Sequence, residues 1–163
     1  MADDTLAAAV RTIYRYADAA IALHQPACRQ CSRCCRFDRY GHNLFVSTAE
    51  AALFLRSTAP SRIAASVTGA CPFLRTDPAR CAARRDRPLG CRLYYCDPAA
   101  QWWQQDLYNL LHGRLQRLHE WFHVPYYYGE WLAVLGTLVT SLTPALTPSA
   151  QSNTGANHFR APS

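Results

Sequence analysis

The chain carries at residues 28–35 the run Cys28-Arg29-Gln30-Cys31-Ser32-Arg33-Cys34-Cys35, and the rest of the fold has to accommodate this run. Two residues between successive cysteines let a tight loop aim its sulfurs at one centre, while backbone N–H groups point at the same sulfurs. In ferredoxin-like sites this C-x2-C-x2-C spacing supplies three corners of an iron–sulfur cubane, and a distant cysteine supplies the fourth. The run therefore predicts a loop that closes around a metal centre.

Four more cysteines follow along the chain, at Cys71, Cys81, Cys91 and Cys96. They are separated by ten, ten and five positions and include no second C-x2-C pair, whereas zinc ribbons favour two separated pairs of that kind. This spacing favours an iron–sulfur cluster of the 4Fe-4S type over zinc. All eight cysteines fall within 69 residues, so metal ligation explains them better than eight separately buried thiols, and we take all eight as candidate ligands.

Eight thiolates are enough for two four-ligand centres. The adjacent residues Cys34 and Cys35 do not easily point at the same metal, because successive side chains diverge. Either one of the two is a spare thiol, or the two serve neighbouring centres.

The length of 163 residues fits one domain, and the 50% apolar content is enough to build a core. The first residues, Met1-Ala2-Asp3-Asp4, lack the basic region and apolar run of a secretory signal. The uncharged stretch 131–144 is shorter than the ~20 apolar residues that cross a bilayer. We therefore expect a cytoplasmic protein with no membrane segment, in which clustered thiols stay reduced and bind metal. A disulfide scaffold is the less favoured alternative.

The net charge of +6 comes entirely from arginine, because the chain has no lysine. Between residues 28 and 96 twelve arginines stand against four acids, a local balance of +8. Guanidinium groups stabilise the negative charge of a multi-thiolate site without competing as ligands. We expect Arg87 and Arg92 to contact the cofactor in this way. Such a surface also attracts nucleic acid, but no recognition helix or RNA-binding motif accompanies it, so we do not expect nucleic acid as a partner.

Helices are predicted on both sides of the cysteine segment. Apolar residues recur at three- and four-residue steps between Thr5 and His24, and Pro26 should end that helix. A similar pattern predicts a long helix from Ala99 to Phe122, and a last helix is expected from Glu130 to Leu142.

The cysteine segment itself holds one predicted helix. Ser47-Thr48-Ala49-Glu50 has capping-box spacing and introduces a short helix through Leu55. The stretch 61–97 is rich in proline and arginine and is predicted to be irregular, so its shape should depend on metal.

The expected fold class is mainly α: a small domain of three to four helices built around cysteine-rich irregular loops that hold a metal centre. We assign residues 1–143 to this single domain, with its cysteine core at 28–96. Residues 144–163 are small, polar and proline-containing, and we expect a disordered C-terminal tail.

Several motifs in combination carry a resemblance to a known family. They are the run 28–35, then Cys71-Pro72-Phe73-Leu74, then Cys81, then Arg87-Pro88-Leu89-Gly90-Cys91-Arg92-Leu93-Tyr94-Tyr95-Cys96. Together they resemble the YkgJ family, the CxxCxxCC domain, to which chelation of zinc or iron is ascribed. The resemblance covers residues 28–96 and all eight cysteines, and 126–131 resembles a stretch common after that domain. The resemblance to this family implies a metal site. A related cysteine-rich domain occurs in flagellin lysine-N-methylases, where iron–sulfur chemistry is implied.

The chain departs from the family in two places. The family usually has glycine after its second cysteine, where this chain has Ser32, so we expect some strain in that loop. The isoleucine–tyrosine–glutamate usual before the arginine–proline motif is replaced by Ala83-Arg84-Arg85, which removes any role of that tyrosine and acid.

Histidine and aromatic residues offer weaker candidates. His24 and His42 flank the first cysteine run, and His119 and His123 form a His-x3-His pair, but helix-end, loop and packing roles explain them better than metal ligation. Trp102-Trp103 and the three tyrosines 126–128 can stack nucleobases, yet a small domain needs such large groups to fill its core.

Three functions remain open from the sequence. A metal-binding protein with a structural, electron-transfer or metal-transfer role fits best, serving metal ions and an unidentified protein partner. An iron–sulfur enzyme with methyltransferase-like activity is the first alternative, although no general base, nucleophile, phosphate loop or HExxH helix is present. A zinc-stapled nucleic-acid binder is the second.

Overall fold

Helices dominate the computed structural model, which describes residues 2–28, 31–59, 62–63, 68–77 and 79–146. Within these ranges there are six α-helices, so the mainly α prediction is confirmed. Four of them have ten residues or more: α1 Ala2–His24, α3 Thr48–Ser57, α5 Gln101–Trp121 and α6 Trp131–Leu146. The remaining two, α2 Phe37–Tyr40 and α4 Leu89–Leu93, are too short for a periodic pattern to reveal and were not predicted.

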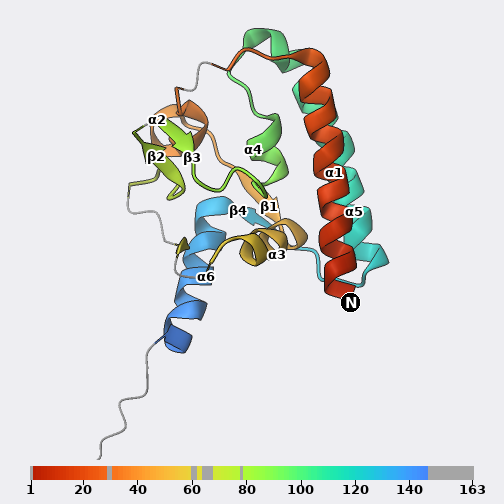
Figure 1. Cartoon of the computed structure of the whole chain (residues 1–163), viewed down its shortest axis with the longest axis vertical. Coiled ribbons are helices and arrows are strands. Elements are labelled where there is room, and N and C mark those ends of the chain that lie inside the picture. The colour runs from red at the N-terminus through yellow and green to blue at the C-terminus, as the bar shows by residue number, and fades with distance from the viewer. Residues whose placement is uncertain (1, 29–30, 60–61, 64–67, 78, 147–163) are drawn as a thin grey trace, which may run out of the picture.

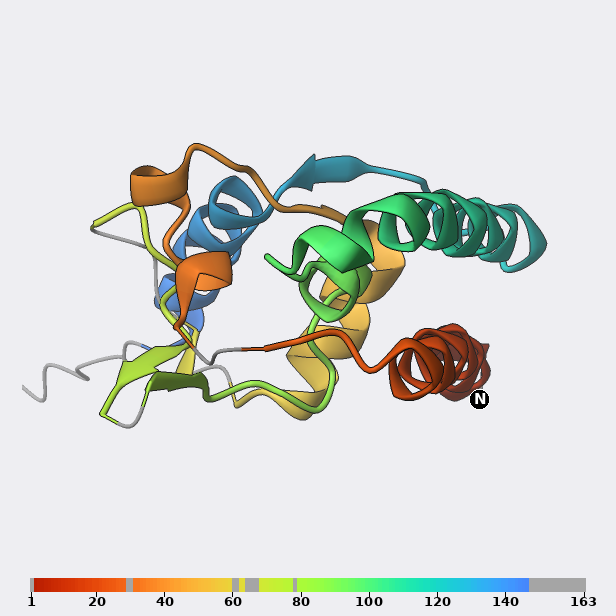
Figure 2. The same cartoon turned by 90° about the horizontal axis from the view of Figure 1, so that it is seen from above.

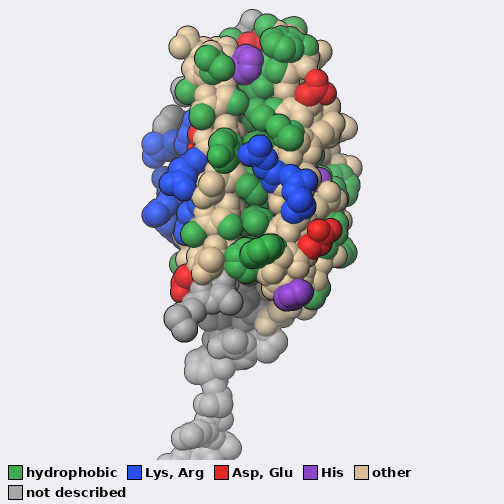
Figure 3. All heavy atoms as spheres, turned by 90° about the vertical axis from the view of Figure 1, so that its right-hand side faces the viewer, with side chains coloured by type: hydrophobic (Ala, Val, Ile, Leu, Met, Phe, Trp, Pro, Cys, Tyr) green, Lys and Arg blue, Asp and Glu red, His purple; other side chains and the backbone are tan. Residues whose placement is uncertain are grey.

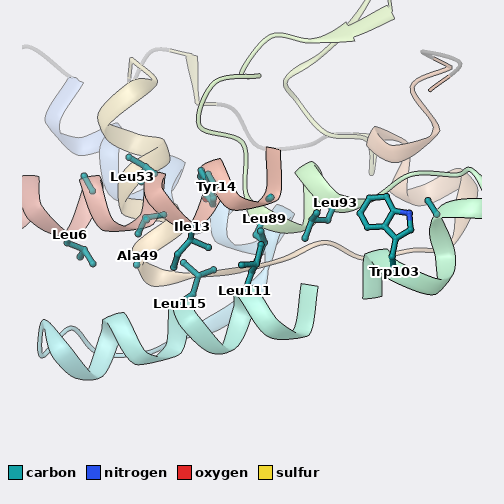
Figure 4. Close-up of a cluster of buried hydrophobic side chains, with 14 residues drawn as sticks. Leu6, Ile13, Tyr14, Ala49, Leu53, Leu89, Leu93, Trp103, Leu111 and Leu115 are labelled. Carbon is teal, nitrogen blue, oxygen red and sulfur yellow. The ribbon is translucent and has the colours of Figure 1, made fainter. Parts of the chain in front are cut away.

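The two longest helices, α1 and α5, lie side by side along one side of the molecule (Figures 1 and 2). Their contact is made by the apolar positions that the sequence pattern placed on one face. Figure 4 shows Ile13 of α1 facing Leu111 and Leu115 of α5, and all three side chains are buried. The same core, which we call the helical core, also includes buried side chains of α3 and α4.

Helix α3 begins where the capping box predicted it. The Ser47 hydroxyl accepts from the backbone N–H of Glu50, and the Glu50 carboxylate accepts from the backbone N–H of Ser47 at 2.9 Å. Glu50 is almost completely buried and also accepts from the Leu89 N–H at 2.8 Å and from the Tyr14 hydroxyl. One carboxylate therefore ties α1, α3 and the start of α4 together.

The predicted irregular stretch 61–97 contains regular structure, so that prediction is wrong in part. Strands β2 (Leu74–Thr76) and β3 (Ala79–Cys81) form an antiparallel hairpin, and α4 follows. A second antiparallel pair joins β1 (Phe45–Ser47) to β4 (Tyr128–Glu130). Each strand has only three residues, which is too short to show a period of two in the sequence.

The last helix extends beyond its predicted end at Leu142. Helix α6 runs through Pro144 to Leu146, so residues 144–146 belong to the helix and not to the predicted tail. Proline disturbs the helical turn before it, and α6 ends two residues after Pro144. The predicted end of the helix was therefore only a few positions too early. Residues 147–163, the rest of that predicted tail, lie outside the described part of the chain.

A second group of buried side chains, which we call the cysteine core, surrounds the start of α6. It contains Val46, Phe54, Phe73, Trp131 and Leu135 and includes Cys71. In Figure 1, α6, α2 and the β2–β3 hairpin lie on the side of the molecule away from α1 and α5, whereas α3 reaches toward α1. The cysteine segment is thus packed against its own apolar cluster.

The solvent-facing side of the α1–α5 pair is mixed in character. Figure 3 shows arginine side chains in two groups on this side, with apolar side chains between them. Trp121 and Leu23 are each 79% exposed. Across the described residues, the structure contains no helix that is both long enough and apolar enough to span a bilayer.

Candidate metal centre

Six of the eight cysteines line a single cavity of about 370 Å³: Cys28, Cys34, Cys35, Cys71, Cys81 and Cys91. They come from segments spread over more than sixty residues of sequence, including the 3-10 helix η1 (Arg33–Cys35), strand β3 and helix α4. The fold therefore gathers thiols that are distant in the chain, which is the first requirement of a shared centre.

Backbone hydrogen bonds fix three of these cysteines relative to one another. The Cys71 N–H donates to the Cys35 carbonyl at 2.8 Å, next to an isolated bridge between Arg36 and Ala70. The Cys71 carbonyl in turn accepts from the Leu74 N–H, and Leu74 pairs with Cys81 in the β2–β3 hairpin. The positions of these cysteines are thus set by main-chain pairing.

The thiol of Cys35 lies between two others. Hydrogen bonding from Cys35 lowers the pKa of Cys34 to about 6 and the pKa of Cys71 to about 7. The same two contacts raise the pKa of Cys35, which keeps the proton that the three sulfurs share. The lowered pKa values favour the thiolate, which is the form that binds metal, at Cys34 and Cys71.

Burial sets the state of two further thiols on the cavity. It raises the pKa of Cys81 and raises the pKa of Cys91 well above its ordinary value, and the nearby Cys71 sulfur adds to both effects. These cysteines hold their protons until a cation supplies the compensating charge, so metal binding here would be coupled to proton release.

Cys31 and Cys96 meet at the surface, outside the cavity lining. Burial raises the pKa of Cys96, and the charge of Cys31 and a hydrogen bond to it act in the same direction. The Ala27 N–H donates to the Asp97 carboxylate at 2.8 Å, which holds the chain just before Cys28 against the chain just after Cys96. Asp97 also accepts from the Ala99 N–H at the start of η3 (Pro98–Ala100).

The loop of the first cysteine run contains the strained position that the sequence predicted. Ser32 has φ 61° and ψ 11°, a left-handed conformation that glycine adopts at lower cost. Its backbone carbonyl accepts from the Cys35 N–H at 3.0 Å, which turns the chain into η1. After this turn, the side chains of Cys34 and Cys35 differ in their exposure to solvent.

Cys35 contacts both Cys34 and Cys71, and Cys31 contacts Cys96, but the side chains do not form a closed set of ligands. Within the described ranges, no three His, Cys, Asp or Glu side chains are gathered closely enough to hold a metal ion. The donor chemistry nevertheless fits the metals expected from the sequence, because clustered thiolates are the ligands of structural zinc and of iron–sulfur clusters. All eight cysteines are free thiols, so none is consumed in a disulfide.

The two predicted arginines have different surroundings. Arg87 lines the cavity, its charge acts on Cys34, Cys81 and Cys91, and its buried Nε has no hydrogen-bond partner among the described residues. Arg92 borders the same cavity, but its guanidinium is bound to Asp18 at 2.9 Å and lies 4.3 Å from the Tyr14 ring centroid. Arg92 therefore joins α4 to α1, and Arg87 is the better placed of the two to balance thiolate charge.

Sequence reasoning did not single out two other arginines on the cavity wall. Arg80 and Arg84 both line it. The +8 balance of the cysteine segment was the signal that such residues existed, but which arginines would face the thiols depends on the β2–β3 hairpin, which was not predicted.

His24, His42 and His119 lie in aromatic contacts. His24 stacks on Trp103 at 4.5 Å, and His42 lines the cavity and stacks on Tyr94 at 5.0 Å. His119 is buried, with Nδ1 3.2 Å from the Val124 carbonyl, and His123 is exposed. The His119–His123 pair is thus split between the core and the surface.

Comparison with known protein families gives a match. A family model named CxxCxxCC, with the description "Putative zinc- or iron-chelating domain", matches residues 27–108, which is half of the chain. No curated protein and no solved structure matches.

Proposed function

The chain belongs to the CxxCxxCC family, and from this premise we propose that it is a cytoplasmic metal-binding protein whose cysteines hold an iron–sulfur centre of the 4Fe-4S type, with zinc as the alternative metal. The observation that carries the proposal is the single cavity lined by six cysteines from separate segments. The centre would organise the fold of the cysteine segment and serve electron or metal transfer to a protein partner.

The residues around the cavity support an anionic thiolate centre. The main chain brings Cys35, Cys71 and Cys81 together, and Arg87 lies near the thiols with an unpartnered nitrogen. An iron–sulfur centre with four thiolate ligands carries net negative charge, which a nearby guanidinium offsets. When bound, such a centre supplies one-electron redox chemistry, and a zinc ion supplies a structural link only.

Anaerobic purification followed by metal and sulfide analysis tests this proposal. We expect a brown protein with broad absorption near ~400 nm and matched iron and acid-labile sulfide. A colourless protein with bound zinc would retain the metal-binding function and assign the alternative metal. A folded protein that binds neither metal would overturn the proposal.

A matched pair of variants makes the metal analysis specific. Cys71→Ser should lower the metal content, because Cys71 is the buried thiol that contacts Cys35. The control Ser57→Ala changes another small polar side chain, away from the cavity, and should leave the metal content unchanged. Equal metal content in both variants would contradict a role for Cys71.

A second candidate function is a cluster-dependent enzyme that acts on a small molecule. The observation that favours it is the rest of the cavity lining, which includes Gln104 and Tyr108 of α5 and Tyr128 of β4. A shift in the visible spectrum on addition of S-adenosylmethionine would support this candidate. An unchanged spectrum across a panel of small ligands would count against it.

A further inference from the structure

Helix α5 has a side that faces solvent and carries large side chains. Its other sides pack on α1 and α4 or line the cavity. Steps of four and three residues place a stripe of six residues along the solvent-facing side: Trp102, Asp106, Leu110, Gly113, Arg117 and Trp121. All except Gly113 are exposed, and the two tryptophans are 70% and 79% exposed. Exposed large apolar groups on one face mark a contact surface.

The stripe is complementary to itself when one copy is reversed. About the midpoint between residues 111 and 112, equal distances along the helix pair Trp102 with Trp121, Asp106 with Arg117, and Leu110 with Gly113. When two copies of a helix pack antiparallel about a two-fold axis, residues equidistant from that axis face each other. Each copy then places an acid opposite a base and a leucine opposite a glycine. We infer that a second copy of this chain docks here, with α5 antiparallel to α5 of the first.

The two charged residues of the stripe need a second copy to form an ion pair. Asp106 and Arg117 are eleven residues apart, roughly 16 Å along the helix, which is too far for an ion pair within one chain. Among the described residues, neither side chain takes part in an ion pair. Arg114, in contrast, has a partner in its own chain, because its guanidinium lies 5.0 Å from the Tyr16 ring centroid. A two-fold dimer forms the Asp106–Arg117 pair twice.

Gly113 has no evident role within a single chain. Glycine destabilises a helix interior relative to alanine, and the backbone at Gly113 is helical, so its conformation does not require glycine. A Cβ atom at this position would meet nothing within 4 Å, so the packing of one chain does not require glycine either. Opposite Leu110 of a second copy, the missing side chain leaves a gap that the leucine fills. Glycine thus lets the two helices approach closely.

The tryptophans give the dimer interface sufficient size. Trp102 touches His24 edge-on, with 5.6 Å between ring centroids, and remains mostly exposed. An aromatic side chain of this size buries at least ~150 Å², so the four stripe tryptophans of a dimer contribute roughly 600 Å². That is about half of the ~1,200 Å² at which specific interfaces begin. Leu110 and the flanking Tyr16, 54% and 56% exposed, enlarge the contact further.

No stripe residue lines the cavity that holds the cysteines. The dimer therefore uses a surface separate from the candidate metal centre, and the inference goes beyond the proposed function.

Sedimentation velocity of the full chain tests this association. The measurement is made without oxygen and with a reductant, because exposed thiols could otherwise join two chains by disulfides. We expect a mass of about twice 18.3 kDa at ~100 μM chain, where even a dimer with a Kd of ~10 μM is mostly assembled. A monomer at this concentration would overturn the inference.

Charge reversal tests the antiparallel register. Asp106→Arg and Arg117→Asp each place like charges opposite one another, so each should raise the dimer Kd at least about tenfold. The double variant exchanges the two charges and should restore most of the wild-type affinity. Arg39→Asp is the matched control: it reverses an exposed charge on α2, away from α5, and should leave the Kd unchanged. Failure of the double variant to restore affinity would overturn the register.

Gly113→Gln separates the dimer from the fold of one chain. Glutamine is the better helix former, so Tm measured at concentrations that keep the chain monomeric should be unchanged or higher. The new side chain fills the gap for Leu110, so the dimer Kd should rise at least about tenfold. An unchanged Kd would contradict the leucine–glycine contact.

The outcomes for this inference and for the proposed function are independent. A monomeric chain that contains iron or zinc would overturn the dimer and leave metal binding intact. A dimeric chain without either metal would overturn the proposed function and leave the dimer intact.

Discussion

Ser32 occupies a left-handed backbone conformation at the turn between Cys31 and η1. A residue with a Cβ atom pays for this conformation, and no capping hydrogen bond from the Ser32 side chain offsets the cost. The position is nearly buried, so solvent offers no compensation either. The strain at this turn therefore comes from the Cβ atom of Ser32.

Ser32→Gly should stabilise the metal-loaded protein by about 0.5–1 kcal/mol, because glycine adopts positive φ without a steric cost. Thermal unfolding of the metal-loaded protein measures this as a higher Tm. Ser32→Ala is the matched control, since alanine keeps the strain and should give no gain. A lower Tm for the glycine variant would show that the serine side chain contributes more than its backbone costs.

Glu50 illustrates how one buried residue joins several elements. Its carboxylate accepts hydrogen bonds from the Ser47 N–H and hydroxyl, the Leu89 N–H and the Tyr14 hydroxyl. These donors belong to the start of α3, the start of α4 and the middle of α1. Loss of the carboxylate leaves buried donors without a partner, which costs more than the loss of the bonds themselves.

Glu50→Ala should lower the free energy of unfolding by roughly 2–4 kcal/mol. Urea denaturation followed by circular dichroism measures this as a shift of the midpoint at constant slope. Glu50→Gln keeps the shape and one acceptor oxygen, so it should lose about half as much. Wild-type stability in both variants would contradict the role assigned to this carboxylate.

At the scale of elements, the long helices were predictable and the cysteine segment was less so. The apolar stripe of α1, the capping box of α3 and the pattern of α5 are local signals, and each appears within one turn or a few turns of sequence. The hairpin that places Cys81 beside Cys71 depends on pairing between three-residue strands. Such short strands carry no periodic signal of their own.

The candidate site, too, could be predicted from the sequence only in part. The cysteine spacing indicates that a metal is bound, and the family match agrees. It does not indicate which thiols are buried and which are exposed, because exposure follows from tertiary packing, in which Cys71 joins the cysteine core and Cys81 and Cys91 pack against it. The assignment of Arg92 as a cofactor contact shows this as well, since its partner Asp18 lies 74 positions away in α1.

The segment before α4 is fastened to α1 by an ion pair between elements. The Arg11 guanidinium donates to the buried Asp86 carboxylate at 3.1 Å. Burial alone would raise the pKa of Asp86, but hydrogen bonding to Arg11 and Ser57 and the charge of Arg11 outweigh it and lower the pKa below 3.8. A lowered folded-state pKa contributes stability above the unfolded value, and this stability is lost as the pH falls through the folded value.

Asp86→Asn should therefore cost about 1 kcal/mol at pH 7, a modest figure because the Arg11 side of the pair is open to solvent. The difference from wild type should shrink as the pH falls below about 4, where the wild-type carboxyl is also protonated. Denaturant midpoints measured from pH 7 to pH 3 provide the test. A difference that stays constant with pH would assign the loss to packing.

At the scale of the whole molecule, the helical core and the cysteine core are distinct. The first packs α1 against α5 with contributions from α3 and α4, and the second packs α6 against the cysteine segment. Only the second contains cysteine side chains. Removal of metal should therefore destabilise the cysteine core more than the helical core.

Removal of metal by a chelator should speed amide hydrogen exchange by tenfold or more in the β2–β3 hairpin and in η1, while α1 and α5 keep most of their protection. Hydrogen exchange with mass spectrometry resolves the two regions. Equal loss of protection in both would show that the cores unfold as one cooperative unit. No change in either would show that metal contributes nothing to folding.

The buried Trp131 indole hydrogen-bonds to the sulfur of Cys71. This contact gives the chain an intrinsic optical sensor. Thiolates and bound transition metals quench an excited indole, and this indole touches Cys71. In the single chain, Trp102 and Trp121 emit from solvent at longer wavelength, which separates their fluorescence from that of Trp131. The other buried tryptophan, Trp103, emits in the same range as Trp131, so its replacement by phenylalanine isolates the signal. In that variant the state of Cys71 can be followed in real time without any attached dye.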